Sequence, residues 1–282
     1  MLLAAVSLTQ ILELLGIGAL AGVLGGMLGI GGGIVMIPAM VFILGQAETY
    51  GPNYFHAYKL AAITTSIILS LPAAIRHSRA KAVVYAMLPG MVPLALVGVL
   101  VGVLTASYLT GASTNTLRRI FGVFLEFVVV VTAFQEWRSL KGEPHLCDAC
   151  PMPRRRALLG TIVGLPAGII AGLLGVGGGI WAVPAQSLLF GVRLRNAIAN
   201  STVMIIGVAA LTSLSLTTFI ARLPADPKMS AATGWWLALW LAPGAILGGW
   251  CGAGLTHRLP VRWLRYTFLV LLAITGYRLI TG

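Results

Sequence analysis

Two glycine-rich segments contain residues that could bind a ligand through their backbone. Residues 22–39 read GVLGGMLGIGGGIVMIPA and residues 168–185 read GIIAGLLGVGGGIWAVPA, with ten of eighteen positions identical. Each glycine costs a helix about 1 kcal/mol relative to alanine, so each triplet predicts a helix break followed by a new helix. The first N–H groups of that helix have no intrahelical partner and carry about half a positive charge, which suits an anion. The predicted anion-binding glycines are Gly31, Gly32, Gly33, Gly177, Gly178 and Gly179.

Close helix packing is the alternative explanation for glycine in these segments. Small residues let membrane helices approach each other, and G-x-x-x-G spacings are common for that reason alone. We assign Gly22, Gly26, Gly168 and Gly172 to packing. The triplets differ, because three adjacent glycines point in three directions and cannot form one packing face. Anion binding is the preferred interpretation of the triplets.

Small polar side chains follow each triplet by about thirty residues. Residues 59–66 (KLAAITTS) align with residues 195–202 (RNAIANST). Their hydroxyl and amide groups could donate hydrogen bonds to an oxyanion. Alternatively, the hydroxyls bond back to carbonyl groups of their own helix. The candidate substrate-binding side chains are Thr64, Thr65, Ser66, Asn200, Ser201 and Thr202.

Few charged residues are placed where they could act on a bound anion. Two helix N-termini contribute about one positive charge between them, which matches a monoanion. A dianion would need Lys59, Arg195 or a carried proton. Glu126 lies inside an apolar segment, where a carboxylate is costly and indicates function. Glu126 is the candidate for proton coupling, and the alternative is a structural role between helices.

The polar central loop contains His145, Cys147 and Cys150. These three could be zinc ligands, but a structural zinc site normally needs four. The sequence therefore predicts no metal site and no cofactor. A redox-active pair and incidental thiols in a reducing compartment are the two remaining interpretations of the cysteines.

The composition is that of a membrane protein. Hydrophobic residues make up 58% of the 282 residues, charged residues make up 9%, and the mean hydropathy is +0.95. Soluble domains have about 25% charged residues. The net charge of +12 would favour nucleic acid as a partner of a soluble protein. Here the basic residues lie in short loops between apolar segments, which indicates membrane orientation and no nucleic-acid partner.

Ten apolar segments divide five and five around the central loop. We predict a first transmembrane repeat at 1–137, a cytoplasmic linker at 138–156 and a second transmembrane repeat at 157–282. Segments 34–44 and 180–190 are too short to span, because a spanning helix needs about 20 residues. We prefer a re-entrant hairpin in each half with eight full spans in total; alternatively, both arms of each hairpin cross.

Alternate loops carry the Lys and Arg residues, so these loops are predicted to be cytoplasmic and both termini outside. A glycine-broken hairpin plus about three spanning helices per half places the two halves in opposite orientations. The predicted fold is therefore an all-α polytopic membrane protein with two inverted repeats. Broken helices in corresponding positions of two halves are the best sequence indication of a transporter's binding site.

The doubled G-x-G-G-G-x-x-x-x-P motif, the later small polar segments and the basic central loop resemble the TauE/SafE sulfite exporter family, also called the sulfonate-uptake permease group. The resemblance covers essentially the whole chain. It implies a non-enzymatic secondary carrier in the inner (plasma) membrane for sulfite, organosulfonates or thiosulfate, coupled to an ion or a proton. The alternatives are a carrier or channel for chloride or a carboxylate, and a membrane redox protein that uses Cys147 and Cys150.

Overall fold

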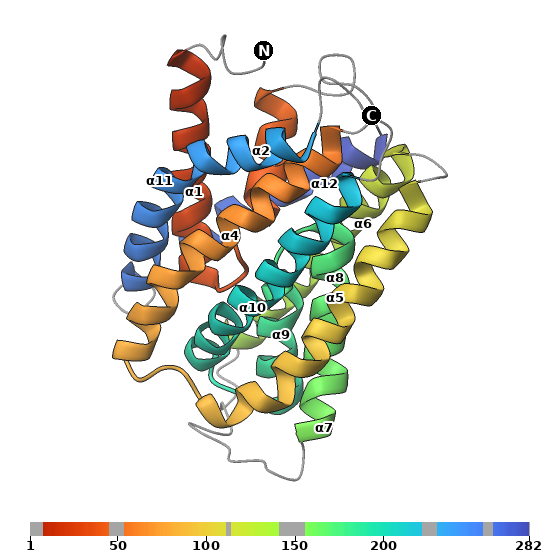
Figure 1. Cartoon of the computed structure of the whole chain (residues 1–282). Coiled ribbons are helices and arrows are strands. Elements are labelled where there is room, and N and C mark those ends of the chain that lie inside the picture. The colour runs from red at the N-terminus through yellow and green to blue at the C-terminus, as the bar shows by residue number, and fades with distance from the viewer. Residues whose placement is uncertain are drawn as a thin grey trace.

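We describe the fold from a computed structural model, in which residues 8–44, 54–110, 114–140, 156–221, 230–255 and 262–281 are described. Almost all of these residues are helical (Figure 1). The elements are α1 (Leu8–Leu28), α2 (Gly33–Ile43), α4 (Tyr54–Arg79), η1 (Tyr85–Met87), α5 (Leu88–Thr110), α6 (Thr114–Leu140), α7 (Arg156–Leu159), η3 (Gly160–Gly164), α8 (Leu165–Leu174), α9 (Gly179–Phe190), α10 (Leu194–Ile220), α11 (Ala231–Leu255) and α12 (Arg262–Thr281).

Both predicted helix breaks are present. In the first half α1 ends at Leu28 and α2 begins at Gly33, and in the second half α8 ends at Leu174 and α9 begins at Gly179. The residue that precedes each new helix is glycine, and no side chain caps the helix start. The helices therefore end at the consecutive glycines, as their low helix propensity predicts.

Six helical segments among the described residues are long and apolar enough to cross a membrane: α1, α4, η1 with α5, α7 through α8, α10 and α11. This result confirms an all-helical, multi-pass membrane fold. The other two spans predicted from the sequence correspond to α6 and α12, which are 27 and 20 residues long and are not among these six. The helices α2 and α9 are short, with 11 and 12 residues.

The first long helix of each half packs against a helix of the other half. Helix α1 lies beside α11, and α8 lies beside α5 (Figure 1). A Cβ atom at Gly22 would lie 2.7 Å from the carbonyl oxygen of Ala245, and one at Gly26 would lie 2.6 Å from that of Gly249. The equivalent glycines of α8 are equally close to the α5 backbone. These contacts confirm the packing role predicted for the glycines of the G-x-x-x-G spacings.

The two central helices, α4 and α10, run antiparallel to each other. The hydroxyl oxygens of Thr64 and Ser213 are 2.7 Å apart. Nearer the start of α4, His56 contacts Phe219 near the end of α10, with 5.5 Å between ring centroids. From His56 to Thr64 the chain of α4 runs forward, whereas the residues of α10 that they contact run backward from Phe219 to Ser213.

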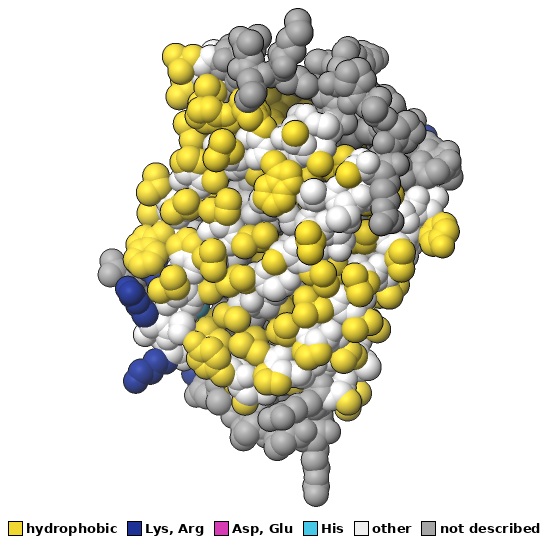
Figure 2. Space-filling view, viewed as in Figure 1, with side chains coloured by type: hydrophobic (Ala, Val, Ile, Leu, Met, Phe, Trp, Pro, Cys, Tyr) yellow, Lys and Arg dark blue, Asp and Glu magenta, His cyan; other side chains and the backbone are white. Residues whose placement is uncertain are grey.

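Basic residues gather at one end of the helix bundle. Arg76 and Arg79 lie in the last turn of α4. The guanidinium group of Arg195, at the start of α10, donates a hydrogen bond to the carbonyl oxygen of Ala80 at 3.1 Å. In Figure 2 most of the visible Lys and Arg side chains lie near this end, whereas hydrophobic side chains cover much of the surface between the two ends. Helix α1 begins and α12 ends at the opposite end of the bundle (Figure 1).

The two arms of the first broken hairpin are unequal. Nε2 of His77, in the last turn of α4, is 3.3 Å from the carbonyl oxygen of Gly26 in α1. The last turns of α1 therefore lie within reach of the His77 side chain. The re-entrant hairpin in each half stays a prediction.

Candidate anion-binding site

The two glycine segments lie against each other in the middle of the protein and run antiparallel. A Cβ atom at Gly33 would lie 2.8 Å from the carbonyl oxygen of Gly175, and one at Gly31 would lie 3.4 Å from that of Val176. A Cβ atom at Gly179 would collide with the carbonyl oxygen of Gly29. The structure therefore brings together the two triplets, which are 146 positions apart in the sequence.

The backbone conformation of these segments favours glycine. Gly29 and Gly31 have φ angles of 65° and 72°, and Gly175, Gly177 and Gly178 have φ angles of 76°, 80° and 73°. Side chains disfavour this left-handed region, whereas glycine adopts it at no steric cost. Each segment can therefore leave one helix and enter the next through four residues.

The backbone N–H groups at the two new helix starts are buried and have no hydrogen-bond acceptor. Within the described residues, the N–H groups of 31–34 and of 177–180 donate to no protein atom, and all eight residues are buried. Most buried N–H groups in proteins are paired, so a cluster of exceptions calls for an explanation. The N-termini of two facing helices provide such donors together with about one positive charge.

The crossing point of the glycine segments lies halfway along α4. A Cβ atom at Gly31 would be 3.6 Å from Oγ of Ser66 and 3.6 Å from a methyl group of Ile205 in α10. Ser66 is at the midpoint of α4 and is fully buried. The candidate site is therefore at mid-depth of the bundle, between the two antiparallel central helices.

Lys59 is a buried lysine at the second glycine break. Among the residues whose side chains the structure describes, it is the one Lys, Arg, Asp or Glu that is fully buried. Its Cβ and Cγ atoms pack against Gly175, and Nζ donates a hydrogen bond to the carbonyl oxygen of Leu173 at 2.6 Å. Lys59 therefore neutralises the carbonyl end of α8 beside the glycine segment.

Arg195 occupies a different environment from Lys59. Its side chain is exposed at the basic end of the bundle, where it bonds to Ala80. Gly29 and Gly175 are equivalent positions of the two repeats; Gly29 packs on Ile198 of α10, and Gly175 packs on Lys59 of α4. Ile198, three positions after Arg195, is therefore the structural counterpart of Lys59. The sequence alignment of α4 with α10 was therefore shifted by three residues, and the structure places only Lys59 at a glycine break.

Four of the six candidate polar side chains behave as expected for hydroxyls inside a membrane helix. Thr65, Ser66 and Thr202 each donate to the carbonyl group four residues earlier, at 2.8 Å. Thr64 pairs with Ser213 across the two central helices. Of these four, Ser66 is next to a glycine of the triplets, and its oxygen retains free acceptor capacity.

Asn200 and Ser201 belong to a buried polar network centred on Gln186. Nε2 of Gln186 donates to Oγ of Ser201, and Nδ2 of Asn200 donates to Oε1 of Gln186, both at 3.0 Å. The N–H group of Val84 donates to Oδ1 of Asn200 at 2.7 Å. The network joins α9 and α10 to the segment before α5. Gln186 was missed in the sequence because nothing in its local pattern separates it from the apolar residues around it.

We expect Gln186→Leu to lower stability more than it alters substrate binding. The substitution removes the donor to Oγ of Ser201 and leaves Nδ2 of Asn200 with only the weak sulfur acceptor of Met87. Loss of a partner costs a buried polar group about 1–3 kcal/mol. The melting temperature of the purified protein should fall by several degrees, while the KM for anion transport changes less than two-fold. A large change in KM with an unchanged melting temperature would instead place Gln186 in the binding site.

The other candidate residues lie away from the glycine segments or cannot be placed. Glu126 in α6 faces α12, where a Cβ atom at Gly276 would be 2.6 Å from its Oε1 atom. His145, Cys147 and Cys150 lie outside the described residues. Cys251 is a free, exposed cysteine in α11.

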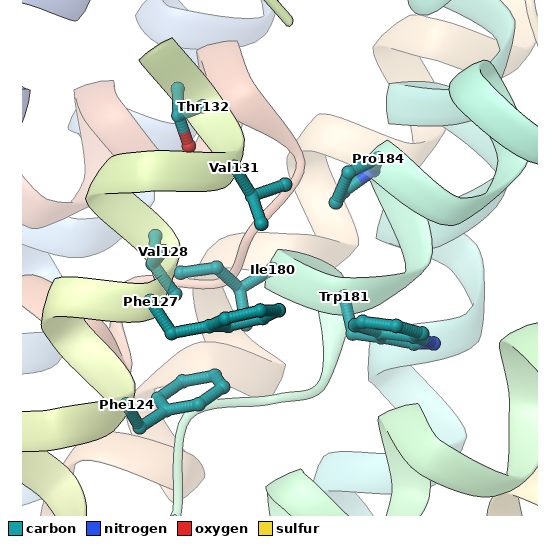
Figure 3. Close-up of a pocket in the computed structure, with 8 residues that line it drawn as sticks. All are labelled: Phe124, Phe127, Val128, Val131, Thr132, Ile180, Trp181 and Pro184. Atoms are coloured by element: carbon teal, nitrogen blue, oxygen red, sulfur yellow. The ribbon is translucent and has the colours of Figure 1, made fainter. Parts of the chain in front are cut away.

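A small hollow between α6 and α9 is unsuited to an anion. Figure 3 shows its lining, in which the ring of Phe127 faces Trp181 and Thr132 supplies the one hydroxyl group. The two rings are stacked, with 6.3 Å between centroids. The remaining lining is apolar: Phe124, Val128, Val131, Ile180 and Pro184. This hollow flanks the start of α9 without offering charge to a ligand.

Comparison with known proteins agrees with a membrane transporter. The chain is 26% identical to the probable membrane transporter protein YunE of Bacillus subtilis, with 94% of this chain and 95% of the relative aligned. A probable membrane transporter protein of Haemophilus influenzae is 25% identical, with 95% and 97% aligned. The probable membrane transporter protein MamO of Magnetospirillum gryphiswaldense is 26% identical over 96% of this chain, which spans 45% of the length of MamO. No solved structure matches the chain. The family described as Sulfite exporter TauE/SafE matches residues 14–279, and the chain belongs to this family.

Proposed function

We propose that this protein is a secondary transporter that moves small sulfur-containing anions across the inner membrane by alternating access. The substrate class is sulfite, an organosulfonate or thiosulfate, and the driving force is a coupled ion or proton. The family supports membrane transport. The substrate class and the mechanism are the parts that we add.

The buried, unbonded N–H groups of 31–34 and 177–180 are the observation that carries this proposal. Oxygen atoms of a sulfonyl or sulfite group accept hydrogen bonds and share a spread negative charge, so they match amide donors that converge from two helix starts. The two segments touch in this structure. The anion would therefore bind when the halves of the site separate slightly toward one side.

Charge at the site is compatible with either a monoanion or a dianion. The two helix N-termini contribute about one positive charge, and Lys59 adds one more at the edge of the same segments. A lone ammonium group buried in a membrane is costly, which favours an arrangement in which it meets an anion. Sulfite, thiosulfate and sulfonates all fall within this charge range.

The arrangement of the helices supports inverted repeats and alternating access. The equivalent helices α4 and α10 run antiparallel, and the glycine segments contact each other reciprocally. Such a relation is expected when one half is inverted relative to the other. Placing the basic end in the cytoplasm puts both termini outside.

Flux measurements in proteoliposomes test the proposed function. The purified protein should take up radiolabelled sulfite, thiosulfate or isethionate at least ten-fold faster than empty liposomes, and a pH gradient should change the rate. Chloride and acetate, tested at the same concentration, should be poor substrates and poor competitors. Faster uptake of chloride or acetate than of every sulfur anion would favour the alternative carrier and overturn our proposal.

Glu126→Gln tests whether the carboxylate in α6 carries the coupled proton. We expect the variant to keep anion exchange at equal pH but to lose most of the acceleration by a pH gradient, because the amide cannot release a proton. Glu13→Gln, near the start of α1, is the matched control and should retain the acceleration. Full pH-driven transport by Glu126→Gln would remove this residue from the mechanism.

A further inference from the structure

We propose that the anion crosses the protein along one face of α4, and that the hydroxyl group of Ser70 is a binding point between the glycine segments and the basic end. This inference rests on the proposed anion transport. It extends the site from the crossing point of the glycine segments to a path along α4 between Lys59 and His77.

Four buried polar side chains of α4 share a single helix face. They are Lys59, Ser66, Ser70 and His77, each at most 1% exposed. Successive spacings of 7, 4 and 7 residues place them within a narrow stripe on a helix with 3.6 residues per turn. Thr64, which pairs with α10, lies on the opposite side of the helix. The stripe is therefore centred on a different side of α4 from Thr64.

Two of these side chains contact the glycine breaks, and a third, His77, contacts α1 just before the first break. Lys59 packs on Gly175 and bonds to the end of α8. Ser66 lies beside Gly31 at mid-depth. Nε2 of His77 is 3.3 Å from the carbonyl oxygen in the last turns of α1. One face of α4 thus follows the glycine segments from one broken hairpin to the other.

Ser70 is the member of the stripe with no partner in the described protein. Its Oγ atom is buried and makes no hydrogen bond, and the residue is 1% exposed. Six Ser and Thr hydroxyls in α4 and α10 bond back to carbonyl groups of their own helix, as those of Thr65 and Ser66 do. A hydroxyl that is buried without a partner costs free energy of about 1–3 kcal/mol. An anion that passes between Ser66 and His77 would supply the missing partner.

The C-terminal end of the stripe lies next to basic residues. His77 is in the same last turn of α4 as Arg76 and Arg79. Clustered positive charge raises the local concentration of anions. An anion that leaves the glycine segments past Ser70 would therefore enter a region that attracts it.

Cysteine reactivity at Ser70 tests the path. We start from a variant in which Cys147, Cys150 and Cys251 are replaced by Ser, and add Ser70→Cys, which nearly preserves side-chain volume. The matched control is Ala209→Cys, a fully buried position of α10 in the apolar cluster that also contains Leu60 of α4. The purified proteins in detergent react with methanethiosulfonate reagents that carry either a sulfonate or a trimethylammonium group. Each rate is divided by the rate of the same reagent with a small thiol.

We expect Ser70→Cys to react with the anionic reagent at least ten-fold faster than Ala209→Cys does, and faster than with the cationic reagent. Isethionate, which does not consume the reagent, should slow this reaction several-fold. Ser70→Ala should also lower isethionate flux about five-fold, mainly through a higher KM. Equal, slow labelling of both cysteines, with a Ser70→Ala flux equal to that of the unchanged protein, would overturn the path.

Flux in the same preparations separates this inference from the proposed function. If the cysteine-free protein transports sulfur anions while Ser70→Cys remains unreactive, the path is wrong and the transport function stands. If no sulfur anion is transported by any variant, the proposed function itself fails, and the path fails with it.

Discussion

Gly179→Ala is expected to reduce sulfur-anion flux at least 100-fold. The added methyl group would collide with the carbonyl oxygen of Gly29 and lie 2.7 Å from a methyl group of Ile205. The contact involves backbone on both sides, so it cannot be relieved by moving a flexible side chain. Overpacking of this kind costs about 1–3 kcal/mol, and any relief must separate the glycine segments that hold the amide donors. Initial rates of isethionate uptake in proteoliposomes measure the effect.

Gly16→Ala is the matched control for this substitution. Gly16 lies in α1, and a Cβ atom there would meet no atom within 4 Å. The substitution should leave flux within two-fold and stabilise the helix slightly, by up to about 1 kcal/mol. Near-normal flux in Gly179→Ala would show that close contact between the two triplets is not needed for transport.

Lys59→Met is the second substitution with a large expected effect. It keeps a long side chain against Gly175 but removes the charge and the hydrogen bond to Leu173. A hydrogen bond to a charged group contributes about 1.5–3 kcal/mol, so kcat/KM for a dianion should fall about 10- to 100-fold. Thiosulfate uptake should fall more than isethionate uptake, because the dianion depends more on the second positive charge.

Two observations separate charge from structure at Lys59. Arg195→Met removes an exposed charge at the basic end and should change both uptake rates less than two-fold. A purely structural role of Lys59 predicts equal losses for thiosulfate and isethionate in Lys59→Met, together with a lower melting temperature. Equal losses would therefore contradict the assignment of Lys59 to the anion.

The sequence alone predicts the helices and the position of the helix breaks well. The apolar segment 8–28 coincides with α1, and the repeated triplets locate the starts of α2 and α9. These features are local, since the cost of glycine in a helix and the length of an apolar segment act within a few turns. The depth of the turn was less predictable, because it depends on how far α1 packs along neighbouring helices.

The polar part of the site was only partly predictable. Lys59 and Arg195 look equivalent when residues 59–66 and 195–202 are aligned by sequence. Packing on Gly175 and Gly29 shows that Ile198 is the true counterpart of Lys59. Similarly, the sequence predicts that the Asn200 amide binds a ligand. In the structure its N–H group donates a hydrogen bond to Gln186 of another helix. Such contacts between distant segments leave no periodic signal in the sequence.

Anomalous diffraction from crystals grown with selenite in place of sulfite is the most direct test of the central claim. Selenium scatters anomalously, so a bound anion can be located independently of its surroundings. We predict one strong selenium peak within about 4 Å of the backbone nitrogen atoms of 31–34 and 177–180, with Lys59 at the edge of the site. Selenium bound only at the basic end, near Arg76 or Arg195, with the glycine segments unoccupied at saturating selenite, would contradict the account.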